Sequence, residues 1–137
     1  MTKVFEYDCA YCGVPCVRSS KGNFFGKFCS NSCQGKFRTE QAISEWLSGV
    51  RLGYSGKTKS LSPFVRRYLY ELRGTACEIC GWDEKHPNDN LPLTEIDHID
   101  GDAENCVPEN LRILCPNCHS MTPTFRARNK SSKRSRS

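Results

Sequence analysis

Two histidines and an aspartate in the second half of the chain have side chains that suit metal-assisted hydrolysis. Asp97 and His98 are neighbours, and His119 directly follows a pair of cysteines. An imidazole can serve as a general base because its pKa is close to neutral. A carboxylate oxygen and an imidazole nitrogen can together hold a divalent metal and leave positions for water. A single histidine is more often structural than catalytic, but this grouping favours a metal site.

Most of the ten cysteines fall into two sets with the spacing of zinc ligands. A Cys-x2-Cys turn places two thiolates within reach of one tetrahedral ion, and a second pair completes four ligands at about 2.3 Å. Four thiolates leave no open position, so each site is expected to be structural rather than catalytic. The first set is Cys9, Cys12, Cys29 and Cys33, and the second set is Cys77, Cys80, Cys115 and Cys118.

Two cysteines, Cys16 and Cys106, remain outside these sets. Cys16 could replace Cys12 as a ligand of the first zinc, but a free thiol is the favoured interpretation. Cys106 lies in the long insert between the two pairs of the second set and is expected to be a buried bystander. Residues 28–33 resemble the second half of a treble-clef zinc finger, where a cysteine turn faces the start of a helix.

The chain lacks the uninterrupted apolar stretch of a secretory signal near its start, and no apolar run approaches membrane-spanning length. A cytoplasmic protein is therefore expected. Thiols stay reduced in the cytosol, where close cysteine pairs favour zinc over disulfides. Zinc also supplies the staple that very small domains need, and a chain of 137 residues holds one modest domain or two very small ones.

Helical periodicity predicts a first helix after the first set of cysteines. Ser30 or Asn31 is the expected cap, and Gly49 is the expected stop. Between them, apolar residues recur at near-helical spacing. These residues are Phe37, Ile43, Trp46 and Leu47.

A second helix is predicted with a clearer apolar face. Ser62 is the expected cap, and Pro63 suits the first turn. The opposite face carries Arg66, Arg67 and Arg73, which form either a solvated surface or a phosphate-contacting one. The apolar residues that share one face are Leu61, Phe64, Val65, Tyr68, Leu69 and Leu72.

The insert between the pairs of the second set predicts the order strand, loop, strand and helix. Residues 93–99 alternate enough for a strand, and residues 110–114 form its antiparallel partner. The acidic segment 100–105 is a turn-rich loop, whose carboxylates either gather cations or, as the favoured interpretation, form a solvated turn. Adjacent strand side chains point to opposite faces, so Asp97 and His98 serve one site only if the strand twists or ends there.

The formal net charge of +5 hides a division of the chain. Residues 82–109 carry nine acidic residues and one lysine, whereas residues 121–137 carry six basic residues and no acidic one. Such a pattern suits basic flanks that bind phosphates around a centre that binds a cation. A plain solvated surface with a disordered basic tail is the alternative interpretation. We expect a four-cysteine zinc-finger module with a helix at 1–48, a flexible linker at 49–60, a second module with a four-cysteine zinc site at 61–125, and a basic disordered tail at 126–137.

The insert resembles the HNH, or ββα-metal, endonuclease family. Asp97 and His98 on the first strand, Asn110 before the second strand and His119 after the last cysteine fill the signature positions. The resemblance covers residues 77–125 and is closest to the zinc-stapled HNH endonucleases of phages and mobile elements, among them homing endonucleases. It implies a small zinc-stabilised α+β fold, with a ββα-metal, treble-clef-like nuclease domain preceded by an N-terminal zinc finger.

The resemblance also implies a chemistry, which is the metal-dependent hydrolysis of phosphodiester bonds in DNA by nicking or double-strand cleavage. His98 is the implied general base, and Asp97 with His119 is the implied ligand pair of one Mg²⁺, Mn²⁺ or Ni²⁺ ion. Asn110 is expected to hydrogen-bond backbone across the loop and to orient the imidazole without touching phosphate. Two Zn²⁺ ions complete the expected cofactors.

Double-stranded DNA is the expected partner, held mostly through its phosphates. Phage packaging or recombination proteins are further candidate partners, no membrane partner is expected, and the chain is expected to be a monomer or a weak dimer. For a phage-encoded protein, the cytoplasm is that of the host bacterial cell. The expected DNA-contacting residues are Arg66, Arg67, Arg112, Arg126, Arg128 and Lys130.

Two other functions remain open at the level of sequence. A non-catalytic, zinc-dependent DNA-binding or packaging accessory protein would keep the fold and bind DNA without metal-dependent cleavage. A protein-interaction adaptor built on two zinc fingers would show no salt-sensitive affinity for DNA, and the basic tail argues against it.

Overall fold

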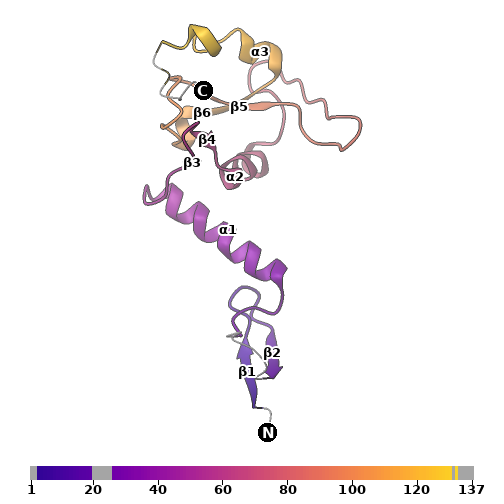
Figure 1. The fold of residues 1–137 in the computed structure, drawn as a ribbon. Helices are drawn as coiled ribbons and strands as arrows, with labels where there is room; N and C mark the ends of the chain where they lie inside the picture. Colours follow the sequence, from indigo (N-terminus) through magenta and orange to yellow (C-terminus); the bar gives the residue numbers. More distant parts are fainter. Residues whose placement is uncertain (1–2, 20–25, 131, 133–137) are drawn as a thin grey trace. The chain divides into compact units, whose positions relative to one another are not determined.

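The computed structural model describes residues 3–19, 26–130 and 132 (Figure 1). The chain divides into two compact units, Met1–Ser44 and Glu45–Ser137. Helices and short antiparallel strands both occur in the described residues, so the expected α+β class is confirmed. Within that described part, no helix is both long enough and apolar enough to cross a bilayer.

The first unit contains one hairpin and most of one helix. β1 (Val4–Asp8) pairs antiparallel with β2 (Pro15–Ser19). α1 (Asn31–Leu47) begins directly after Ser30, whose Oγ accepts a hydrogen bond from the backbone N–H of Cys33 at 3.1 Å. This is N-cap geometry, so Ser30 is the cap of the two candidates.

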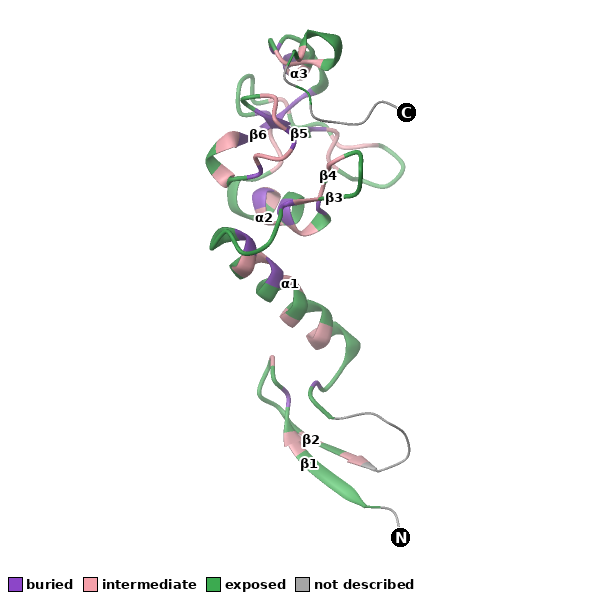
Figure 2. Ribbon diagram, turned by 60° about the vertical axis from the view of Figure 1, so that its left-hand side comes forward, coloured by how far each residue is buried: buried purple, intermediate pink, exposed green. Residues whose placement is uncertain are grey.

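The core of the second unit forms around α2 (Pro63–Arg73). Val65 and Leu69 are fully buried on one face of this helix, and Trp46 joins them in the same buried cluster. Figure 2 draws the buried part of α2 in purple. The apolar face predicted for the helix is confirmed for these residues. Leu72 is 64% exposed, because the cluster reaches no further along the helix than Leu69.

The start of α2 differs from the prediction in its cap. Ser62 stands at the cap position, but its side chain makes no cap hydrogen bond, and its backbone N–H donates to the carbonyl of Gly53 at 2.8 Å. Gly53 belongs to the segment expected to be a flexible linker, where β3 (Tyr54–Ser55) pairs with β4 (Ser60–Leu61). A Cβ on Gly53 would lie 2.6 Å from the Cβ of Cys106, so this segment packs into the second unit instead of forming a bare connection.

The elements that carry the candidate residues follow in the predicted order. β5 (Glu95–His98) pairs antiparallel with β6 (Leu111–Leu114), and α3 (Pro116–Ser120) comes directly after β6 (Figure 1). Both strands are shorter than the sequence suggested. β5 ends at His98, which meets the condition under which adjacent residues of a strand can serve one site.

The segment after α3 is partly built into the second unit. Arg126–Arg128 form a 3-10 turn, and Nδ2 of Asn129 donates to the carbonyl of Gly101 at 2.7 Å. The beginning of the tail that was expected to be disordered is therefore ordered by its contact with the loop after β5. The remainder of that prediction, at residues 131 and 133–137, lies outside the described residues.

Candidate functional site

Two side chains of α2 fix the ends of the strands beside the candidate residues. The Tyr70 hydroxyl donates to the carbonyl of Thr94, just before β5, at 2.6 Å. Arg73 donates to the carbonyl of Leu111 at 2.6 Å and to that of Pro108 at 2.8 Å, at the start of β6. Arg73 is therefore an anchor for the backbone, a role that neither interpretation of its helix face had included.

One cleft of the second unit is lined by all three candidate residues. It has a volume of about 560 Å³ and is lined from β5, α3 and the C-terminal segment. Asp97 and His98 reach it from the end of β5, and His119 reaches it from α3. The structure thus brings together the side chains that the sequence grouped. Other polar or charged residues of the lining are Ser60, Arg66, Glu95, Thr124, Arg126, Asn129 and Ser132.

Asp97 and His119 place one oxygen and one nitrogen close together. Nε2 of His119 lies 3.5 Å from Oδ1 of Asp97. Two ligands that bind one ion at about 2.1 Å, at an angle between square and tetrahedral, lie about 3.0 to 3.5 Å apart, so the pair fits one divalent metal. The other oxygen of Asp97 accepts a hydrogen bond from Nε of Arg112 at 2.8 Å, and Asp97 is only 5% exposed. The carboxylate is therefore held in place with Oδ1 toward His119.

The imidazole of His98 forms one wall of the cleft and is 7% exposed. Its Nε2 lies 3.4 Å from Sγ of Cys106, and the same sulfur lies 3.3 Å from the carbonyl oxygen of Ala103. Cys106 is buried, as expected, but it is not a bystander, because its thiol contacts the candidate base.

Asn110 ties together the loop that follows His98. Its Oδ1 accepts from the backbone N–H of Asp100 at 3.1 Å, and its Nδ2 donates to Oδ1 of Asp100 at 2.9 Å and to the carbonyl of Asn105 at 2.8 Å. The carbonyl of Asn110 accepts from the N–H of Ile99 at 2.9 Å. These bonds agree with a residue that orients the site, and that role stays a prediction.

The carboxylate of Asp100 organises the same loop. Its oxygens accept from the backbone N–H of Asp102 and from Nδ2 of Asn105, both at 2.8 Å. Burial alone raises the pKa of Asp100, but hydrogen bonds from Asn105, Asp102 and Asn110 outweigh it and lower the pKa. The carboxylate therefore serves the turn, as the favoured interpretation held.

Sequence reasoning missed one carboxylate at this cleft. Glu95 lies two residues before Asp97 on β5, and its Oε2 lies 2.5 Å from Nδ1 of His119. Side chains at positions i and i+2 of a strand share a face. The spacing of Glu95 and Asp97 therefore held the signal that could have identified it.

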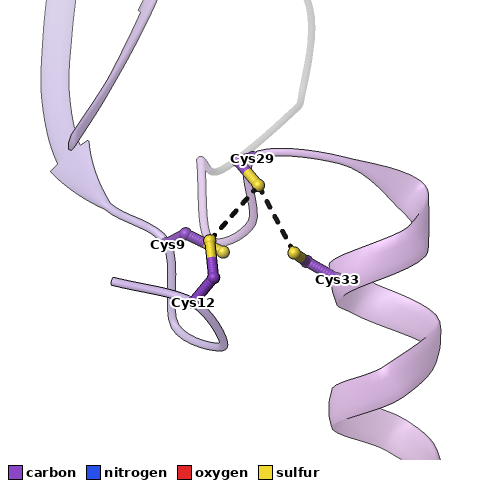
Figure 3. A group of neighbouring side chains, drawn as sticks. All are labelled: Cys9, Cys12, Cys29 and Cys33. Atoms are coloured by element: carbon purple, nitrogen blue, oxygen red, sulfur yellow. Dashed lines mark hydrogen bonds between the residues drawn. The ribbon is translucent and has the colours of Figure 1, made fainter. Parts of the chain in front are cut away.

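Both predicted sets of zinc ligands are gathered, with the four sulfurs of each set within 4.8 Å of one another. A tetrahedral ion with sulfur ligands at about 2.3 Å separates those sulfurs by about 3.8 Å. In the first set, Sγ of Cys29 lies 3.6 Å from that of Cys12 and 3.4 Å from that of Cys33 (Figure 3). In the second set, the sulfurs of Cys80 and Cys115 are 3.7 Å apart. Both sets fit zinc.

The pKa is lowered for one thiol of the first set and raised for one thiol of the second set. Burial alone raises the pKa of Cys9, but backbone hydrogen bonds from Cys12 and Cys29 outweigh it and lower the pKa to about 6. In the second set, the hydrogen bond with the Cys115 side chain, followed by burial, raises the pKa of Cys118 to about 12. When a metal binds closely spaced thiols such as these, the thiols lose their protons and bind the ion as thiolates.

Cys16 stays outside the first set. Its thiol lies on β2, 3.3 Å from the carbonyl oxygen of Val14. Cys12 is the residue that completes the four-sulfur group, which argues against the alternative in which Cys16 takes its place.

The predicted DNA contacts are divided between several positions. Arg66 and Arg126 line the cleft. Arg67 lines a neighbouring groove that it shares with Arg66. Arg112 forms an ion pair with the buried Asp97. Two further residues of the predicted set, Arg128 and Lys130, are exposed.

Known proteins resemble this chain over the region that forms the cleft. The family model of the HNH endonuclease matches residues 77–123. The H-N-H endonuclease F-TflIV of Escherichia phage T5 is 36% identical over 93 residues, which cover 65% of this chain and 39% of the length of that relative. No solved structure matches the chain. The matched segment contains the second set of cysteines together with Asp97, His98 and His119, so residues 77–123 are similar to the HNH endonuclease family.

Proposed function

We propose that the protein is a metal-dependent endonuclease that hydrolyses phosphodiester bonds of double-stranded DNA. In this proposal His98 is the general base, and Asp97 with His119 holds one Mg²⁺, Mn²⁺ or Ni²⁺ ion. The observation that carries it is the shared cleft, in which the oxygen and nitrogen of the ligand pair lie 3.5 Å apart beside His98, within the domain that matches the HNH family.

Each side chain of the cleft has a separate task in the proposed reaction. His98 accepts the proton of the attacking water, a task that suits imidazoles in general because their ordinary pKa is close to neutral. Asp97 and His119 hold the ion, which when bound supplies positive charge for the phosphate and the departing oxygen. Arg66 and Arg126 line the same cleft and bind DNA phosphates there.

Two structural Zn²⁺ ions complete the proposal. One would hold the N-terminal module at residues 1–48, and the other would close the base of the nuclease domain at residues 61–125. Four sulfurs surround each position, so no vertex is open for substrate. In modules this small, the free energy of zinc binding contributes directly to folding.

Cleavage of supercoiled plasmid at low salt tests the proposed activity. Zinc-loaded wild-type protein is expected to nick or linearise the plasmid when Mg²⁺ or Mn²⁺ is added and to leave it intact in chelator. His98→Ala is expected to be slower by a factor of about 10² to 10⁴, since a general base contributes that much. His86→Ala is the matched control, because the ring of His86 lies outside the lining of the cleft and accepts a hydrogen bond from its own loop.

Equal activity of the wild type and His98→Ala, with both zincs bound, would contradict the assignment of the base. DNA binding in a gel shift without metal-dependent cleavage would favour the non-catalytic accessory function instead.

A further inference from the structure

The two ring nitrogens of His119 face different partners. Nδ1 lies 2.5 Å from Oε2 of Glu95, whereas Nε2 lies 3.5 Å from Oδ1 of Asp97. Both partners are carboxylates that only accept, and the contact at Nδ1 is the shorter by 1.0 Å, so in a neutral ring the proton is on Nδ1 and is donated to Glu95. The lone pair of the ring is then on Nε2, the nitrogen that faces Asp97.

Strand geometry explains how two carboxylates reach one imidazole. Glu95 and Asp97 are two residues apart on β5, so their side chains project from the same face. His119 lies on α3, which directly follows β6, the strand paired with β5. The imidazole is therefore placed beside that face and meets both carboxylates.

Other contacts limit the movement of the two proposed metal ligands. The ring of Phe125 packs edge-on against that of His119, with centroids 5.0 Å apart and planes at 78°. Asp97 is held through Oδ2 by Arg112 at 2.8 Å. Each ligand thus has one polar atom toward the other ligand and its second polar atom bound to a neighbouring side chain.

We propose that Glu95 is a positioning residue of the metal site, which keeps the proton of His119 on Nδ1 and so presents the lone pair of Nε2 beside Asp97. The inference rests on the proposed function, because it concerns the metal that this function requires, and it assigns no contact between Glu95 and the ion. Removing an outer partner of a metal-binding histidine typically lowers metal affinity about 10-fold to 100-fold.

The substitution Glu95→Ala is a fair test because Glu95 is an exposed residue of a short strand, with 56% of its side chain accessible. Glu95→Gln removes the charge but keeps an acceptor oxygen. Glu84→Ala is the matched control, since Glu84 is an exposed glutamate outside the cleft lining. Retained zinc content and an unchanged circular dichroism spectrum check that each variant folds.

Nitrogen NMR of His119 reports the tautomer directly in zinc-loaded protein without added divalent metal. The pH is raised until the nitrogen shifts of His119 no longer change, so that the spectrum is that of the neutral ring. The wild type, Glu95→Gln and Glu84→Ala are expected to show the proton on Nδ1. Glu95→Ala is expected to show a mixture of both tautomers.

Calorimetric titration with Mn²⁺ is the second readout. Glu95→Ala is expected to bind Mn²⁺ at least about tenfold more weakly than the wild type. Glu84→Ala is expected to bind it as the wild type does, and Glu95→Gln is expected to lie between Glu95→Ala and the wild type.

If His119 keeps the wild-type tautomer in Glu95→Ala, the inference is overturned, whatever the Mn²⁺ affinity. If Mn²⁺ binding is weaker although the tautomer is unchanged, Glu95 is itself a ligand of the ion. A changed tautomer with unchanged Mn²⁺ affinity also overturns it. If the wild type binds no Mn²⁺ and cleaves no DNA, the proposed function fails on its own. In that case the tautomer of Glu95→Ala still decides whether Glu95 positions His119.

Discussion

The thiol of Cys106 contacts the candidate base, His98. We therefore expect substitution of this buried cysteine to change the rate of cleavage. Cys106→Ala removes the sulfur 3.4 Å from Nε2 of His98. Because the imidazole then loses a contact that restricts its orientation, kcat is expected to fall about tenfold to a hundredfold. The KM for DNA is expected to stay unchanged, since Cys106 is buried.

Steady-state cleavage of a short duplex measures both parameters for Cys106→Ala. Cys106→Ser keeps a group that can donate and accept a hydrogen bond, so it is expected to restore part of kcat. A lower melting temperature with unchanged kcat would show that the thiol only fills space, and would contradict this account.

At the residue scale, the sequence predicted the composition of the cleft better than its internal contacts. Asp97, His98 and His119 could be grouped from their types, from the place of His119 directly after Cys118, and from the resemblance to the HNH motif. The contacts of Glu95 with His119 and of Cys106 with His98 depend on where side chains meet in three dimensions. Cys106 lies eight residues from its partner in a loop without a regular period, so no spacing rule could reveal it.

At the element scale, hydrogen bonds from α2 hold the two strands beside the cleft, β5 and β6, in place. Tyr70→Phe removes the hydroxyl that donates to the carbonyl of Thr94 at 2.6 Å. The loss of one partly buried hydrogen bond is expected to lower the free energy of unfolding by about 1 kcal/mol. Urea unfolding of the zinc-loaded protein measures the difference.

Tyr68→Phe is the control for this change, because Tyr68 packs its ring against Trp46 and its hydroxyl has no partner among the described residues. Equal losses of stability in the two variants would mean that the bond from Tyr70 does not hold β5.

Helices and strands that bury one face could be predicted from the sequence, and those that bury neither face could not. Val65 and Leu69 repeat at helical spacing on the buried face of α2, so the helix could be located. In β1 four of the five residues are exposed, including Phe5, so the strand lacks the alternation of apolar and polar residues that identifies half-buried strands. Gly53 looked like part of a linker, and only its close approach to Cys106 shows that it is packed.

Zinc is expected to be required for the fold of the second unit. Trp82 packs against the second set of cysteines, so its fluorescence reports on their integrity. Because zinc must displace thiol protons, and the pKa of Cys118 is raised to about 12 by its hydrogen bond with Cys115 and by burial, zinc is expected to be held less tightly as the pH falls. Chelator is expected to shift the fluorescence, and added zinc is expected to restore it.

Zinc release measured with an indicator dye across a pH series checks the direction of this change. Native fluorescence in protein shown to be free of zinc would contradict a structural role for the metal.

At the scale of the whole molecule, the uneven distribution of charge predicts how DNA affinity depends on salt. Truncation after Asn129 removes Lys130, Lys133, Arg134 and Arg136 but keeps the bond from Asn129 to Gly101. Each lost phosphate contact reduces the slope of log affinity against log salt by about 0.9, so a reduction of about 2 to 4 is expected. Fluorescence anisotropy with a labelled duplex measures both slopes, and an unchanged slope would exclude the tail from DNA binding.

The central claim is that His98 and His119 have different tasks at one phosphodiester bond. Single-turnover cleavage of a labelled duplex, with Mn²⁺ affinity measured on the same zinc-loaded samples, separates these tasks. His98→Ala is expected to lose a factor of about 10² to 10⁴ in rate and to keep its Mn²⁺ affinity, whereas His119→Ala is expected to lose both. Cleavage by His98→Ala at the wild-type rate, or loss of Mn²⁺ binding as complete as in His119→Ala, would contradict the claim.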